Sequence, residues 1–402
     1  MISHSAWDWK PLLPLMLTAL SLGAVVLAMA WLKMESRWSL RQRLGVVSAV
    51  TLFLCFDLIL FGAYTRLSDS GLGCPDWPGC YGHGSPLGAD AAIDEAAALM
   101  PTGPVTLKKA WIEMIHRYAA MTVGLLILGL FVVSWWQVYR HRLARGTPPE
   151  PDMDLNQAWS MARWSTLTLF WVGVQGLFGA LTVSSRLYPA IVSLHLLGGM
   201  MLLTLLSILT FKLQGASSKG WLTRLGRVQH GPNPAVSNTR GWWGVIGLGL
   251  LLLWGQMALG AWVSTNYAVL ACQTFPLCQG QWWPAMNFAQ GFEIWRPLGL
   301  SADGGAIDFA ALTAIHVVHR LGAACVLLGL SWVAWQLHRQ GRVTLSRALV
   351  LLLAVQILSG VSNVVLEWPL LAALTHVGGA AVLVLCLTWG GLLAPRDLVS
   401  EA

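Results

Sequence analysis

Five histidines of the 402-residue chain lie inside long apolar stretches, where polar side chains are uncommon. They are His116, His195, His316, His319 and His376. An ionisable group in such a stretch is costly to bury and by default marks a functional site. The simpler alternative is that each histidine makes a hydrogen bond between neighbouring helices, as polar side chains in membrane bundles do.

The apolar stretches that carry these histidines are long enough to cross a bilayer. The chain is 56% hydrophobic and only 11% charged, and a helix needs about 20 apolar residues to span the hydrocarbon core. Nine stretches qualify, at roughly 12–32, 44–64, 111–138, 160–181, 190–211, 242–263, 310–337, 348–366 and 371–393. The sequence therefore predicts an all-α protein that crosses the membrane several times and contacts lipid.

The positive charges predict how the chain is oriented. Lys and Arg concentrate in segments 33–43, 140–163, 212–240 and 339–347, and positively charged loops stay in the cytoplasm. We therefore expect a bacterial inner-membrane protein with a periplasmic N-terminus and a cytoplasmic C-terminus. The same bias explains the net charge of +7, so no nucleic-acid partner is expected.

The two halves of the chain carry the same features in the same order. Residues 198 positions apart match at Gly62 and Gly260, Cys74 and Cys272, and Cys80 and Cys278. A separation of 203 relates His116-Arg117 to His319-Arg320, and one of 181 relates Gln175 and His195 to Gln356 and His376. This pattern predicts two tandem four-helix transmembrane bundles related by a parallel internal repeat, plus one extra N-terminal transmembrane helix.

The predicted division of the chain follows from this repeat. Residues 1–43 hold the extra helix and a cytoplasmic loop, 44–211 the first bundle, 212–241 a cytoplasmic linker, 242–393 the second bundle and 394–402 a cytoplasmic tail. The loops 65–110 and 264–309 are long and rich in Pro and Gly, which makes them candidates for substrate access or docking.

Four of the five histidines form matching pairs. Counted from the predicted outer ends of their helices, His116 and His195 fall at one depth in the first bundle, near the periplasmic side, and His319 and His376 at the same depth in the second. Two imidazoles on different helices can bind one heme iron from both sides. Zinc or copper would need further ligands, and only His316 is close by. We therefore predict heme iron between each pair.

Charged residues next to these histidines suggest different tasks for the two bundles. The guanidiniums of Arg66, Arg117 and Arg320 suit heme propionates. In the first bundle, Glu113 lies three residues before His116, whereas in the second bundle His316 lies three residues before His319. At this spacing each residue lies on the same face of its helix as the histidine that follows it. We predict chemistry in the first bundle and electron storage in the second. The alternative is that Glu113 only forms an ion pair with Arg117.

Four of the seven cysteines are paired in the two outer loops. Cys74 with Cys80, and Cys272 with Cys278, each enclose five residues that include proline. Disulfides persist on the oxidising side of the membrane, and the enclosed turn residues favour closure of the loop. We predict two disulfides. A metal site is the alternative, although neither loop supplies the further ligands that zinc usually needs.

Several motifs in combination resemble the heme A synthase family. They are FGAYTRLSDSGLGCPDWPGCYG, IEMIHR, SLHLLGG, HVVHRLG and LTHVGG, spread over residues 44–393. The resemblance implies a heme b cofactor held by His319 and His376. It implies that heme O binds as substrate at His116 and His195, with Glu113 near the reacting edge, and that two hydroxylations of its C8 methyl group give the formyl group of heme A.

The resemblance also implies partners. It suggests heme O synthase, an electron donor and a homo-oligomer, and it links Cys74 and Cys80 to heme handover or redox input. Two other functions fit paired histidines: a two-heme membrane cytochrome that transfers electrons, and a heme transporter or chaperone. The first leaves the difference between Glu113 and His316 unexplained. The second expects sites near the bilayer midplane, whereas the predicted sites lie near one face.

Overall fold

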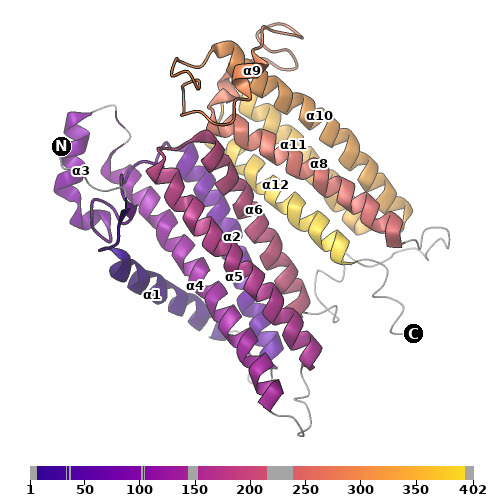
Figure 1. Ribbon diagram of the computed structural model, residues 1–402. Helices are drawn as coiled ribbons and strands as arrows, with labels where there is room; N and C mark the ends of the chain where they lie inside the picture. The colour runs from indigo at the N-terminus through magenta and orange to yellow at the C-terminus, as the bar shows by residue number, and fades with distance from the viewer. Residues whose placement is uncertain are drawn as a thin grey trace. The chain divides into compact units, whose positions relative to one another are not determined.

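The computed structural model describes residues 7–32, 34–35, 38–100, 103, 105–143, 153–214 and 239–393. These residues contain nine helices that are long and apolar enough to cross a membrane (Figure 1). They are α1 (Leu12–Leu32), α2 (Leu40–Leu67), α4 (Leu107–Leu143), α5 (Leu155–Ser184), α6 (Pro189–Gln214), α8 (Thr239–Thr265), α10 (Phe309–Arg339), α11 (Val343–Val365) and α12 (Leu370–Leu392). The prediction of an all-α, multi-pass membrane protein is confirmed. The tail 394–402 and most of the predicted linker lie outside the described residues.

The contacts divide the chain into two compact units. The first comprises Met1–Leu187 and Met201–Gly215, and the second Tyr188–Met200 and Ala216–Ala402. The N-terminal half of α6 thus packs with the second unit, where Ala190 joins a cluster with Trp262 and Ile315. The predicted bundle boundaries at 44–211 and 242–393 stay predictions.

In the first unit, α4 packs against α1, α2 and α5. Side chains from four helices meet in one core cluster that includes Leu44, Leu130, Met161 and Leu209, and the Ser48 and Thr210 hydroxyls share a buried 2.7 Å hydrogen bond. The start of α2 is fixed by a capping box between Ser39 and Gln42, which satisfies two backbone N–H groups at the helix end.

The extra helix α1 lies beside α4 in the same unit (Figure 1). Strand β1 (Trp7–Asp8), just before it, pairs in parallel with β2 (Trp77–Pro78) of the first cysteine loop. The rings of Trp7 and Trp9 lie 5.4 and 5.7 Å from that of Trp77, and Leu15 is fully buried in a cluster with both loop cysteines. The N-terminal segment therefore covers the first cysteine loop.

The second unit contains a closed four-helix arrangement. Helix α8 packs against α10 and α12, and α11 packs against the same two helices (Figure 1). The loop between α8 and α10 holds the 3-10 helix η3 (Ala268–Ala271) and the short helix α9 (Phe288–Gly291). In the first unit, the loop between α2 and α4 holds η1 (Pro86–Gly88) and α3 (Asp90–Leu99).

Backbone conformations recur in the two units at the separations found in the sequence. Left-handed residues Asp69 and Tyr81 match Tyr267 and Gln279, which lie 198 positions later. Consecutive left-handed residues end α5 at Arg186 and Leu187 and recur after α11 at Glu367 and Trp368, 181 positions later. Side chains other than glycine rarely adopt this conformation, so its recurrence at matching positions supports a duplicated unit.

Candidate functional site

The two histidines of the second unit lie on different helices, His319 on α10 and His376 on α12. They are close enough for their charges to interact. A side chain at Gly260 would place its Cβ 3.1 Å from Cε1 of His319, and one at Gly360 would lie 3.2 Å from Cε1 of His376. Each imidazole thus packs directly against the backbone of a neighbouring helix.

Each of these rings also has a polar neighbour at Nδ1. The side-chain amide of Gln256 lies 3.0 Å from Nδ1 of His319, and the hydroxyl of Ser359 lies 3.1 Å from Nδ1 of His376. A histidine that binds metal through one ring nitrogen commonly hydrogen-bonds through the other. The hydroxyl of Ser359 can accept from Nδ1–H of His376, which fits ligation of an iron through Nε2 of that ring. For His319 the same ligation requires the amide of Gln256 to turn, because its nitrogen faces Nδ1 at 3.0 Å and Nε2 at 3.5 Å.

The histidine of α4 repeats this packing in the first unit. A Cβ at Gly62 of α2 would lie 3.0 Å from Cε1 of His116, as Gly260 does for His319. The ring of Phe61 stacks on that of His116, with centroids 6.2 Å apart and planes inclined by 15°. The equivalence of His116 and His319 therefore extends from the sequence to the helix that each ring contacts.

His195 lies on the N-terminal half of α6. Its Nδ1 is buried and has no hydrogen-bond partner among the residues that the structure describes. A buried imidazole nitrogen without a partner is costly. The ring is therefore available to bind a ligand.

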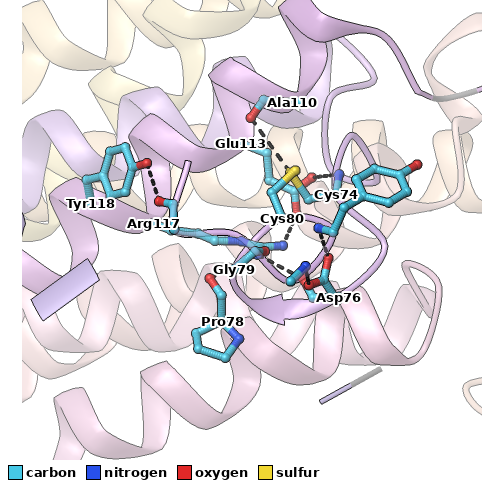
Figure 2. The surroundings of a disulfide bond; sticks show 12 residues. Cys74, Asp76, Pro78, Gly79, Cys80, Ala110, Glu113, Arg117 and Tyr118 are labelled. Carbon is cyan, nitrogen blue, oxygen red and sulfur yellow. Dashed lines mark hydrogen bonds and ion pairs between the residues drawn. A yellow bond between two sulfur atoms is a disulfide. The ribbon is translucent and has the colours of Figure 1, made fainter. Parts of the chain in front are cut away.

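Glu113 and Arg117 fasten the first cysteine loop to α4 (Figure 2). Oε1 of Glu113 accepts from Nη2 of Arg117 at 2.5 Å, and Oε2 accepts from the backbone N–H of Cys74 at 2.9 Å. Nη1 of Arg117 donates to the carbonyls of Asp76, Pro78 and Gly79. The ion pair considered in the sequence is present, and it is buried and tied to the disulfide loop.

The first loop is held further by Asp76, whose buried carboxylate accepts from the backbone N–H groups of Tyr81 and Gly82 at 2.6 and 2.8 Å. Burial, and then the negative charge of Asp76, raise the pKa of the Tyr81 phenol. Tyr81 and Gly82 both have positive φ, the combination that a tight type I′ turn requires. The turn brings Cys80 and His83 into a two-bond bridge.

The second cysteine loop is fastened in the same way by different residues. Arg320 donates to the carbonyls of Thr274, Leu277 and Cys272 at 2.9–3.0 Å. His316 takes the place of Glu113, and its Nδ1 donates to the carbonyl of Ala268 at 3.0 Å. Glu113 and His316 each lie three residues before a histidine that is predicted to bind iron, and each thus contacts the backbone of an outer loop.

The three arginines predicted to bind propionates have partners within the protein. Arg117 and Arg320 use their terminal nitrogens on loop carbonyls, whereas Nε of Arg320 is buried without a hydrogen-bond partner among the described residues. Arg66 lies 3.5 Å from the exposed carboxylate of Asp69. Propionate binding by these arginines stays a prediction.

Both predicted disulfides are present, Cys74–Cys80 and Cys272–Cys278. Across the described residues, no three side chains of the types His, Cys, Asp or Glu are placed to hold a bare metal ion. The donor set instead consists of separate imidazoles beside backbone that glycine keeps clear, which suits a flat macrocycle with axial ligands.

Comparison with known proteins places this arrangement in a family. Residues 45–388 match the model of the COX15-CtaA family, described as cytochrome oxidase assembly protein. A protein named heme A synthase from Shewanella oneidensis is 37% identical over 88% of this chain and 95% of its own length. The chain belongs to the heme A synthase family. Further relatives of that name from Allorhizobium ampelinum and Alkalihalophilus pseudofirmus are 29% and 27% identical over 91% and 89% of the chain.

Membership of the heme A synthase family makes the chain an oxidoreductase rather than a passive carrier. The family match begins at residue 45 and so includes the matched histidines and both cysteine loops, while α1 lies before it. The helix that covers the first cysteine loop therefore lies outside the residues that the family model matches.

Two side chains that contact the ring nitrogens, those of Gln256 and Ser359, are not among the residues predicted from the sequence. Gln256 lies four residues before Gly260, and Ser359 lies directly before Gly360, which the separation of 181 relates to Gly179. The available signal was a difference between the halves, because the repeat places Leu58 opposite Gln256 and Phe178 opposite Ser359.

The disulfides lead to a prediction about thiol chemistry. In intact protein, a thiol reagent should label the four loop cysteines only after reduction, because both pairs are oxidised and buried. Labelling sites are read by mass spectrometry of peptides. The denatured and reduced protein, in which all seven cysteines should be labelled, serves as the control. Labelling of all four loop cysteines before reduction would contradict the pairing.

Proposed function

We propose that this protein oxidises the C8 methyl group of heme O to the formyl group of heme A. Two successive hydroxylations give first an alcohol and then a geminal diol, which loses water to leave the aldehyde. The observation that carries the proposal is the pair of matched histidine sites with unlike surroundings, found in a chain of the heme A synthase family.

In the second unit, His319 and His376 would hold the iron of heme b as the resident cofactor. Support comes from the two rings, which are packed by glycines and hydrogen-bonded at Nδ1. When bound there, heme b supplies reversible one-electron chemistry. The protein contributes ring orientation and a water-poor surrounding, and Nε of Arg320 is a free donor for a propionate.

The substrate heme O binds through His116 and His195, with Glu113 beside it. Support comes from the equivalence of His116 and His319, from the free Nδ1 of His195 and from the place of Glu113 one turn from His116. A carboxylate there can accept a proton while the methyl group is oxidised. Its bonds to Arg117 and Cys74 connect the reacting edge to the disulfide loop.

The protein resides in the bacterial inner membrane with a periplasmic N-terminus, a cytoplasmic C-terminus and both heme sites near the periplasmic side. The charge distribution supports this orientation, as do two disulfides in loops on one predicted face. The partners that we propose are heme O synthase as the source of substrate, an electron donor and further copies of the chain.

Analysis of the bound hemes tests the function. We expect the purified protein to release heme b together with heme O or heme A, separated by chromatography after acid extraction. Cells that lack their own heme A synthase should form heme A when this chain is expressed. Heme b alone at two per chain would favour the electron carrier, and unmodified heme O after turnover with a reductant would favour the transporter.

A further inference from the structure

The two units differ in the side chain that stands next to each ligand ring. In the second unit, His319 and His376 have Gln256 and Ser359 at Nδ1. The repeat places Leu58 and Phe178 at the corresponding positions of the first unit, and neither side chain can form a hydrogen bond. Nδ1 of His195 has no partner among the described residues.

We propose that Gln256 and Ser359 are positioning residues that retain the resident heme b and set its potential. This rests on the proposed function, because it takes heme b as the ligand of the second unit. A substrate heme must leave after oxidation and a cofactor must stay. Loss of a hydrogen-bond partner behind a ligating histidine costs about 10- to 100-fold in metal affinity.

The bonding of Ser359 shows how it acts on His376. Its single hydroxyl hydrogen is donated to the carbonyl of Val355 at 2.7 Å. Toward the ring the oxygen can then only accept, so the proton of the imidazole lies on Nδ1. Nε2 is left with its lone pair, which is the form that binds iron.

Gln256 carries the groups needed to act on Nδ1 of His319 in a similar way. Its Nε2 lies 3.0 Å from both Nδ1 and the carbonyl of His319, while its Oε1 is buried without a hydrogen-bond partner among the described residues. A half-turn of the amide would let Oε1 accept a hydrogen bond from Nδ1–H, the protonation that iron binding at Nε2 requires, at the cost of the bond from the amide to the carbonyl of His319. Gly322 leaves the room for this oxygen, since a Cβ there would collide with it.

A hydrogen bond accepted from Nδ1–H makes the imidazole a stronger donor to iron, which favours the ferric state and lowers the reduction potential. Removal of either acceptor should therefore raise the midpoint potential of heme b and speed its loss.

The chain offers a matched control in Gln356. Its Nε2 donates to the carbonyl of His376 at 3.0 Å, as Gln256 does for His319. The side chain of Gln356 makes no hydrogen bond to a ligand ring among the described residues, and the contact of Gln356 with the His376 ring comes from its backbone, which the substitution leaves in place. Gln356→Leu thus removes the same backbone bond as Gln256→Leu and leaves the ring partner in place. A difference between these two variants isolates the ring contact.

The experiment compares Gln256→Leu, Ser359→Ala and Gln356→Leu in the purified full-length protein. Transfer of heme b to excess apomyoglobin gives the loss rate, and a redox titration followed at the heme b absorption band gives the potential. We expect the first two variants to lose heme b about 10- to 100-fold faster than the parent and to have higher potentials. Gln356→Leu should match the parent, and Ser359→Thr, which keeps the hydroxyl, should restore both readouts.

Equal loss rates and equal potentials for Gln256→Leu and Gln356→Leu would overturn the inference. If Gln256→Leu does not accumulate, Gln256→Glu provides the test. A carboxylate accepts a hydrogen bond more strongly than an amide, so this variant should lower the midpoint potential of heme b. A higher midpoint potential would overturn the inference. His319→Ala and His376→Ala separate this from the proposed function. If the His319→Ala and His376→Ala variants keep heme b, the assignment of the iron ligands is wrong. If these two variants lose heme b while the Gln256 and Ser359 variants behave as the parent, only the positioning role is wrong.

Discussion

Replacing either His319 or His376 by Ala will leave the purified protein with less than about a tenth of the parent's heme b. Each substitution removes one of two axial bonds to iron, a larger loss than that of a hydrogen-bond partner behind the ligand. The pyridine hemochrome assay measures heme b per chain, and the reduced spectrum reports whether any remaining iron keeps two histidine ligands.

His338→Ala is the matched control. It lies on the same helix, α10, at the exposed end, and should bind heme b as the parent does. A folding failure is recognised from the rate at which a reductant opens Cys272–Cys278, because the pair is buried only while the second loop is intact. Parent-like heme b content in both His319→Ala and His376→Ala would refute the assignment of these ligands.

Much of the fold follows from the sequence because bilayer thickness sets the length of each apolar stretch. The nine stretches were placed correctly, but several helices extend further. Helix α4 continues through Arg140, His141 and Arg142, since basic residues stabilise the last turn of a helix. Helix α2 begins at Leu40 because Ser39 and Gln42 form a capping box, a motif that hydropathy does not register.

The site was predictable where it depended on spacing within one helix. The pair of Glu113 and Arg117 follows from a separation of four residues, and it is present. Arg117 and Arg320 were expected to share the ligand's surroundings because they follow it directly. Consecutive helical residues point in different directions, and both guanidiniums reach loop carbonyls instead.

Contacts between helices were harder to foresee. Gln256 and His319 come from different helices, as do Ser359 and His376, and hydropathy does not indicate which faces of two helices meet. The duplicated unit compensates in part, because a polar residue in one half and an apolar residue in the other mark a position where the two sites differ.

Glu113→Gln is expected to slow formation of heme A by about 100- to 10,000-fold, the contribution typical of a group that transfers a proton, while heme b in the second unit stays at the parent level. Heme O or the alcohol should then accumulate, as measured by chromatography of extracted hemes. Gln is preferred to Ala because its amide oxygen keeps a hydrogen-bond acceptor for Arg117 or the Cys74 N–H, whereas both substitutions remove the counter-charge of the buried Arg117.

Arg117→Gln separates chemistry from loop anchoring. It breaks the same ion pair and the bonds to the loop carbonyls but leaves a carboxylate at position 113. If Glu113 acts on the reaction, Glu113→Gln lowers heme A much more than Arg117→Gln does. Equal losses of heme A, with Cys74–Cys80 opened faster by a reductant in both variants than in the parent, would mean that Glu113 serves only to hold the loop. In that case the two units would share one anchoring role, filled by Glu113 in the first and His316 in the second, and the difference between their hemes would have to arise at the ligand rings.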